Sequence, residues 1–112
     1  MDKKIAKRSE IKFTVSLDED KHPVAIEWDA TDSGMERAKK CESIMLSIWD
    51  ASVKSSYRID LWTDKMIVDD MKRFMYETLT TMADTYEKAT SDNENAAELR
   101  AFSQKFADKV SL

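Results

Sequence analysis

Alternating apolar and polar residues open the chain and predict a β-hairpin. The segments Ile11–Leu17 and Val24–Trp28 both alternate in this way, which is typical of strands with one buried face. The polar run Asp18–Pro23 separates them and contains neither an Asn-Gly nor an Asp-Gly pair. We therefore expect two antiparallel strands joined by a loop longer than a two-residue turn.

A helical pattern follows and predicts a first helix from about Ser33 to Ala51. Ser33 and Glu36 have the spacing of a capping box, in which side chains satisfy backbone N–H groups at a helix start. Apolar residues then recur at helical spacing, namely Ala38, Cys41, Ile44, Met45, Ile48 and Trp49. On this interpretation Cys41 is a small core residue rather than a nucleophile.

The segment Tyr57–Phe74 changes from a period of two to a helical period within a few residues. Its first half predicts a third strand, and a long helix is expected from about Val68 to Ala89. The residues Ser91–Glu94 are rich in helix-capping side chains, so we place a break there. A last helix then carries its apolar stripe on Leu99, Phe102, Phe106 and Val110.

These elements predict an α+β fold with the order ββαβαα. A sheet with one apolar face needs a cover, and three amphipathic helices supply one. We therefore expect a two-layer sandwich in which three helices pack on one face of a three-stranded antiparallel or mixed sheet. A chain of 112 residues fits a single domain over residues 1–112, with residues 1–8 as a flexible arm.

Composition limits where in the cell the protein is expected to lie and which classes of partner it is expected to bind. The formal net charge is −4 with both signs interspersed, which gives no drive toward nucleic acid. No signal peptide, lipobox or run of roughly 18 apolar residues is present, so we expect no direct membrane insertion. Cys41 is the only cysteine and cannot form an intrachain disulfide. We therefore predict a cytoplasmic protein.

The residue pattern offers little for catalysis, metals or cofactors. His22 is the only histidine, and no serine or cysteine is placed by the sequence for activation by it. The acidic run Asp18–Asp20 lacks the glycine and the final glutamate of a calcium loop. Glu27, Asp29 and Asp32 could gather as oxygen ligands, but strand alternation and a helix start explain them equally well. With a single glycine, phosphate-binding loops are also excluded. We predict a non-enzyme without metal or cofactor.

The polar face of the predicted sheet carries the candidate partner-binding residues. These are Lys12, Thr14, Glu27, Arg58, Asp60 and Trp62. A tryptophan exposed beside charged groups is a common composition for a protein contact. The alternative is that Trp62 is covered by the N-terminal arm or by its own turn. A free sheet edge would also permit strand addition by a partner or by a second copy, giving a homodimer.

Five segments, in the same order and spacing, resemble the gliding motility protein GldC family of Bacteroidota. They are Ser9–Val15, Ile26–Ala30, Met45–Asp50, Arg58–Thr63 and Asp69–Phe74. The resemblance implies an accessory protein that acts by contact with other gliding-machinery proteins rather than by catalysis. It implies no catalytic residues. The alternative hypothesis is a carrier for a small hydrophobic ligand, with a pocket rich in methionine and tryptophan between sheet and helices.

Overall fold

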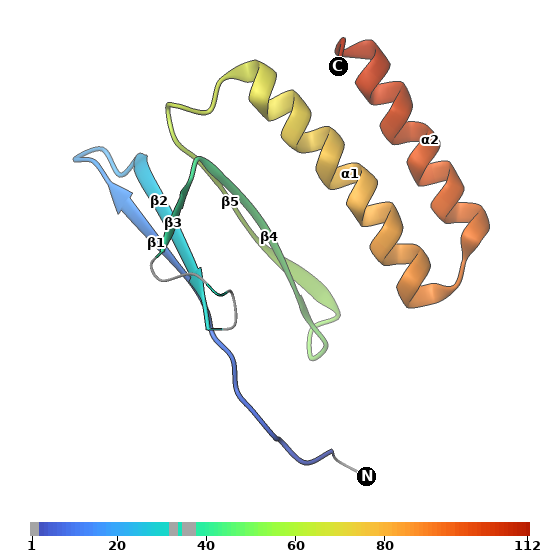
Figure 1. Cartoon of the computed structure of the whole chain (residues 1–112), viewed down its shortest axis with the longest axis horizontal. Coiled ribbons are helices and arrows are strands. Elements are labelled where there is room, and N and C mark those ends of the chain that lie inside the picture. Colours follow the sequence, from blue (N-terminus) through green and yellow to red (C-terminus); the bar gives the residue numbers. More distant parts are fainter. Residues whose placement is uncertain (1–2, 32–33, 35–37) are drawn as a thin grey trace. The chain divides into compact units, whose positions relative to one another are not determined.

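The structure is a computed structural model and describes residues 3–31, 34 and 38–112. The described elements are β1 (Ile11–Leu17), β2 (Pro23–Ala30), β3 (Lys39–Cys41), β4 (Ser43–Asp50), β5 (Ser55–Trp62), α1 (Val68–Thr90) and α2 (Asn93–Lys109) (Figure 1). They fall into two compact units, Met1–Met66 and Ile67–Leu112. We call these the strand unit and the helical unit and describe each by itself.

The protein is α+β as expected, but the predicted arrangement of three helices on one three-stranded sheet is wrong. In the described residues, β1, β2 and β3 form an antiparallel sheet in that order, and β4 and β5 form a separate antiparallel pair. In the described part of the chain, two helices follow instead of the predicted three. The order ββαβαα is therefore wrong, and the elements that the structure describes are five strands and then two helices.

The error lies in the segment predicted as the first helix, where the structure has β3 and β4. Ile44 and Ile48 fit a helical period, but with Leu46 they also fit a period of two. Pairing decides between the two, because Ile44 lies opposite Leu61 and Ile48 opposite Tyr57. Such apolar cross-strand pairs stabilise a sheet. The predicted capping box, Ser33 and Glu36, lies outside the described residues.

The first hairpin is confirmed, and Asp18 shapes its turn. One carboxylate oxygen of Asp18 accepts hydrogen bonds from the backbone N–H groups of Asp20 and His22, both at 2.9 Å. Lys21 takes the left-handed conformation with a φ of 64°. Pro23 starts β2, a position where a strand tolerates its missing N–H group. The loop closes through its own polar side chain, which explains why it needs no Asn-Gly pair.

Among the described residues of the strand unit, the buried apolar side chains are Ile26 and Ile44, and one buried residue carries a hydroxyl. Ile26 lies on the central strand, between Val15 of β1 and Cys41 of β3. The hydroxyl belongs to Thr63, which is 1% exposed and donates to a carboxylate oxygen of Glu42 at 3.1 Å. The backbone N–H of Thr63 also donates to the Glu42 carbonyl at 2.9 Å. These bonds join the end of β5 to the residue between β3 and β4.

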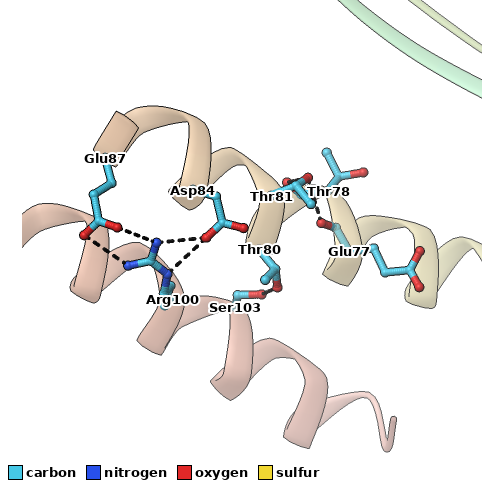
Figure 2. A network of polar contacts seen from close by, with 8 residues as sticks. All are labelled: Glu77, Thr78, Thr80, Thr81, Asp84, Glu87, Arg100 and Ser103. Carbon is cyan, nitrogen blue, oxygen red and sulfur yellow. Dashed lines mark hydrogen bonds and ion pairs between the residues drawn. The ribbon is translucent and has the colours of Figure 1, made fainter. Parts of the chain in front are cut away.

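The helical unit is a hairpin whose seam consists of small side chains. Helix α1 ends within one residue of the predicted boundary. The buried residues at the seam are Ala83, Ala96, Ser103 and Ala107. Figure 2 shows the hydroxyls of Thr80 and Ser103 in contact, 2.7 Å apart, between the two helices. Small residues let the helix backbones approach closely, whereas Phe102 from the predicted stripe is 58% exposed.

Arg100 locks the two helices together along this seam, between Ala96 and Ser103 on α2. Its guanidinium donates to Asp84 at 2.8 Å and to Glu87 at 3.0 Å, as the left side of Figure 2 shows. The hydrogen bond to Glu87, followed by that to Asp84, raises the pKa of Arg100. A planar guanidinium that bridges two carboxylates on one helix sets the register of α2 against α1.

The loop between the helices is held by Asp92, which we predict to be an acid-sensitive cap. Its carboxylate accepts from the Asn95 side chain at 2.7 Å, from the Tyr86 hydroxyl at 2.7 Å and from the Asn95 backbone at 3.1 Å. These bonds, led by that from the Asn95 side chain, lower the pKa of Asp92. Because the pKa is lower in the folded state, the stabilisation is full above the unfolded value, about 3.9, and falls as pH drops through the folded value.

We therefore expect Asp92→Ala to lower the melting temperature at pH 7, with a difference from wild type that shrinks as pH falls below about 4. Asp92→Asn is the matched control, since asparagine also caps helices but does not titrate. Melting curves followed by circular dichroism at a series of pH values check this. A difference between Asp92→Ala and wild type that stays constant to pH 2 would contradict the assigned role.

Candidate interaction face

The structure places the six candidate partner-binding residues on two different sheets. Lys12, Thr14 and Glu27 lie on the polar face of the β1-β2-β3 sheet. There Lys12 pairs with Asp29, and Glu27 lies between Thr14 and Lys40. Opposite charges at paired positions stabilise a sheet, which accounts for Glu27 and Asp29 without a metal ion. Asp32, the third member of the proposed oxygen cluster, lies outside the described residues.

The other three candidates share one side of the β4–β5 pair. Strand register puts eight side chains on this side, which we call the tryptophan face: Ser43, Met45, Ser47, Trp49, Ser56, Arg58, Asp60 and Trp62. Trp49 is 62% exposed and Trp62 is 57% exposed. Trp49 lies opposite Ser56, six positions before Trp62 on β5, so the backbone positions of the two tryptophans are about 20 Å apart along the strands.

An organised ion pair fills the middle of the tryptophan face. The Nε and Nη2 groups of Arg58 donate to the two carboxylate oxygens of Asp60, at 3.2 Å and 2.8 Å. A third donor, Nη1, bonds to the hydroxyl of Ser47 on β4. The hydrogen bond that Arg58 donates to Asp60, followed by the negative charge of Asp60, raises the pKa of Arg58. The guanidinium is therefore fixed along the strands in a single orientation, although both side chains remain about half exposed.

Trp49 was not among the predicted contact residues, and the mistaken helix explains why. In a helix it falls on the apolar stripe with Ile48 and Met45. In the strand it moves to the side of Arg58, while Ile48 turns to the opposite side with Tyr57. The signal for this strand is the period of two over Ser43–Asp50, in which Ile44, Leu46 and Ile48 alternate with residues of the tryptophan face.

Beside this face, a cavity of about 430 Å³ opens between the β1–β2 turn and the end of β5. Its wall contains three aspartates and a histidine together with apolar side chains: Asp18, His22, Pro23, Val24, Asp60, Leu61, Trp62, Thr63 and Asp64. The cavity lies within the strand unit, and its carboxylates distinguish it from the methionine-rich pocket expected of a hydrophobic-ligand carrier.

Asp18, Asp20 and His22 come close enough to share a metal ion, with ligand atoms within 4.8 Å of one another. All three are exposed, and Asp18 already accepts two backbone hydrogen bonds that close the turn. Turn formation is thus sufficient to explain their proximity. The lone Cys41 is half-buried on β3, and burial, followed by the charge of Glu42, raises its pKa. A thiol with a raised pKa is a weak nucleophile.

The family comparison covers the second strand through to the C-terminus. A model of the gliding motility-associated protein GldC-like family matches residues 23–112. No curated protein and no solved structure matches this chain. Among the residues that the structure describes, no helix is both long and apolar enough to cross a lipid bilayer. The match includes β2, both strands of the tryptophan face and both helices. The chain therefore belongs to the GldC-like family of gliding motility-associated proteins.

Proposed function

We propose that this protein works in the gliding machinery as a non-catalytic interaction module, and that the tryptophan face is its contact with another protein of that machinery. The family match supports the association with gliding. The observation that carries the contact is a pair of exposed indoles on either side of a fixed arginine–aspartate pair. A cytoplasmic location remains a prediction.

The chemistry of this face suits protein recognition. Tryptophan and arginine are the side chains most enriched at binding hot spots, because each contributes a large rigid surface that can also donate a hydrogen bond. Arg58 is already held in place by Asp60 and Ser47, so binding does not have to order it. The spacing of about 20 Å between the backbone positions of the two tryptophans matches a standard interface of roughly 800 Å² per partner.

The polar face of the β1-β2-β3 sheet supports the proposal less. Lys12 and Glu27 have charged residues of opposite sign at neighbouring positions, and this face has no exposed aromatic residue among those described. Both sheets have edge strands, so a homodimer formed by pairing of two such edges stays a further prediction. The carrier hypothesis has no support in the family match.

We expect Trp49→Ala and Trp62→Ala each to weaken partner binding about tenfold, as at a moderate hot spot. Arg58→Ala is expected to act in the same direction, because it also leaves Asp60 unpaired. The measurement is affinity capture with the tagged protein in a gliding bacterium that lacks its own copy, together with the gliding speed of single cells. Both readouts should fall together.

Tyr57→Ala is the matched control, because Tyr57 is an exposed aromatic on β5 that points to the opposite side of the strand pair. Melting curves for all four variants show whether each one folds. If the tryptophan variants fold and still recover the wild-type partners at wild-type yield, the tryptophan face is not the contact. A loss confined to Tyr57→Ala would move the contact to the other side of β4 and β5.

A further inference from the structure

We propose that the cavity beside the tryptophan face receives a basic side chain, arginine or lysine, from the protein partner. This inference rests on the proposed function, since it gives the chemistry of a partner that the tryptophan face contacts. The cavity and the tryptophan face share Asp60 and Trp62. A partner chain lying along β5 would therefore reach both.

The wall of the cavity has an apolar part and an aromatic part, and a long basic side chain can use both. Pro23, Val24 and Leu61 supply apolar surface for the aliphatic stem. The indole of Trp62, still 57% exposed, offers an aromatic surface that can attract a cation. A volume of about 430 Å³ falls in the range of small-ligand sites and exceeds what a single metal ion would fill.

The charges of the wall are only partly balanced from within the chain. Asp60 is paired with Arg58 through both carboxylate oxygens. Asp18 uses one oxygen for the turn and has the imidazole of His22 at 3.8 Å from the other. The side chain of Asp64 has no ion pair or hydrogen bond to any other described residue. The wall thus presents net negative charge, centred on Asp64, to a ligand of opposite sign.

A basic side chain fits this wall better than a metal ion does. Ions such as Ca²⁺ take six to eight oxygen ligands, and Asp18 and Asp60 have already committed oxygens to internal hydrogen bonds. An ion would also leave Leu61 and Trp62 without a role. A guanidinium or ammonium group needs only one free carboxylate and the indole, while its stem covers the apolar wall.

The test uses the full-length protein and a capped pentapeptide, Gly-Gly-Arg-Gly-Gly, with citrulline in place of arginine as the neutral control of the same shape. Titrations are followed by ¹H–¹⁵N NMR at constant ionic strength. We expect saturable shifts of the Trp62 indole N–H and of the backbone signals of His22 and Asp64 with the arginine peptide. The citrulline peptide should leave these signals in place.

Asp64→Asn should weaken binding of the arginine peptide roughly two- to fivefold, as for loss of one exposed ion pair. Glu98→Gln removes the same charge from an exposed position on α2 and should change nothing. The proposal is overturned if citrulline shifts the same signals equally, if Asp64→Asn binds as tightly as wild type, or if Ca²⁺ or Zn²⁺ perturbs the cavity while the arginine peptide does not.

The cavity and the tryptophan face can fail separately. Trp49 does not line the cavity, so Trp49→Ala should bind the arginine peptide normally even if it loses the partner. Asp64 does not belong to the tryptophan face. Suppose that Trp49→Ala loses the partner and that neither the wild-type protein nor any variant binds the arginine peptide. The proposed function then stands, and the proposal that the cavity receives a basic side chain is wrong. If instead the wild-type protein binds the arginine peptide and Trp49→Ala recovers the partner normally, the cavity binds a basic side chain but the tryptophan face is not the contact.

Discussion

Ile26→Ala is expected to lower the free energy of unfolding by about 2–5 kcal/mol, the usual cost of truncating a buried isoleucine. Ile26 is 1% exposed and is the largest fully buried side chain in the described part of the chain. It lies on the central strand, paired with Val15 on one side and Cys41 on the other. Loss of its side chain leaves a cavity on the central strand β2, between Val15 of β1 and Cys41 of β3.

A loss of this size is a large part of the roughly 5–15 kcal/mol that stabilises a domain. The melting temperature should fall by about 4 °C for each kcal/mol. Ile11→Ala is the matched control, because Ile11 is on the same face of the same sheet and is 69% exposed. Urea unfolding followed by tryptophan fluorescence measures both. Equal losses for Ile26→Ala and Ile11→Ala would show that the core has been placed wrongly.

Ala96→Leu is expected to destabilise the helical hairpin by about 1–3 kcal/mol, because it forces a larger side chain into a closed seam. Ala96 is 0% exposed and shares one face of α2 with Arg100, Ser103 and Ala107. Because Ala96 is fully buried, we expect the larger leucine side chain to push the two helices apart. Separation would also lengthen the bonds from Arg100 to Asp84 and Glu87.

Ala97→Leu is the matched control one residue away. Ala97 is exposed, and the change in helix propensity from alanine to leucine is the same small one in both variants. Thermal unfolding monitored by circular dichroism should show a lower melting temperature for Ala96→Leu alone. If Ala97→Leu proves the more damaging, the seam runs along a different face of α2 from the one described.

The candidate site was partly visible in the sequence. Strand alternation over Tyr57–Trp62 was enough to leave Arg58, Asp60 and Trp62 on one side, and the structure keeps them there. Their bidentate contact could not be predicted, because it depends on the rotamers of Arg58 and on Ser47 from another strand. Lys12, Thr14 and Glu27 were expected beside them only because a single sheet was assumed.

The residues that line the cavity come from parts of the sequence that lie far apart. Asp18 and His22 come from the first hairpin, whereas Asp64 follows the last strand. No pattern within a window of ten or twenty residues relates them. They meet because the hydrogen bonds from Thr63 to Glu42 hold the end of β5 against the residue that joins the two sheets.

The sequence alone determined those helices, strands and turns whose conformation depends on residues close together in the chain. This holds for the hairpin over Ile11–Trp28, for the strand over Tyr57–Trp62, for α1, and for the break capped by Asp92. The tertiary structure alone decided whether Ser43–Asp50 is helix or strand, because its apolar residues satisfy both periods and only pairing with β5 separates them. That choice determines the position of Trp49, since a helix would place it in a core and a strand exposes it beside Arg58.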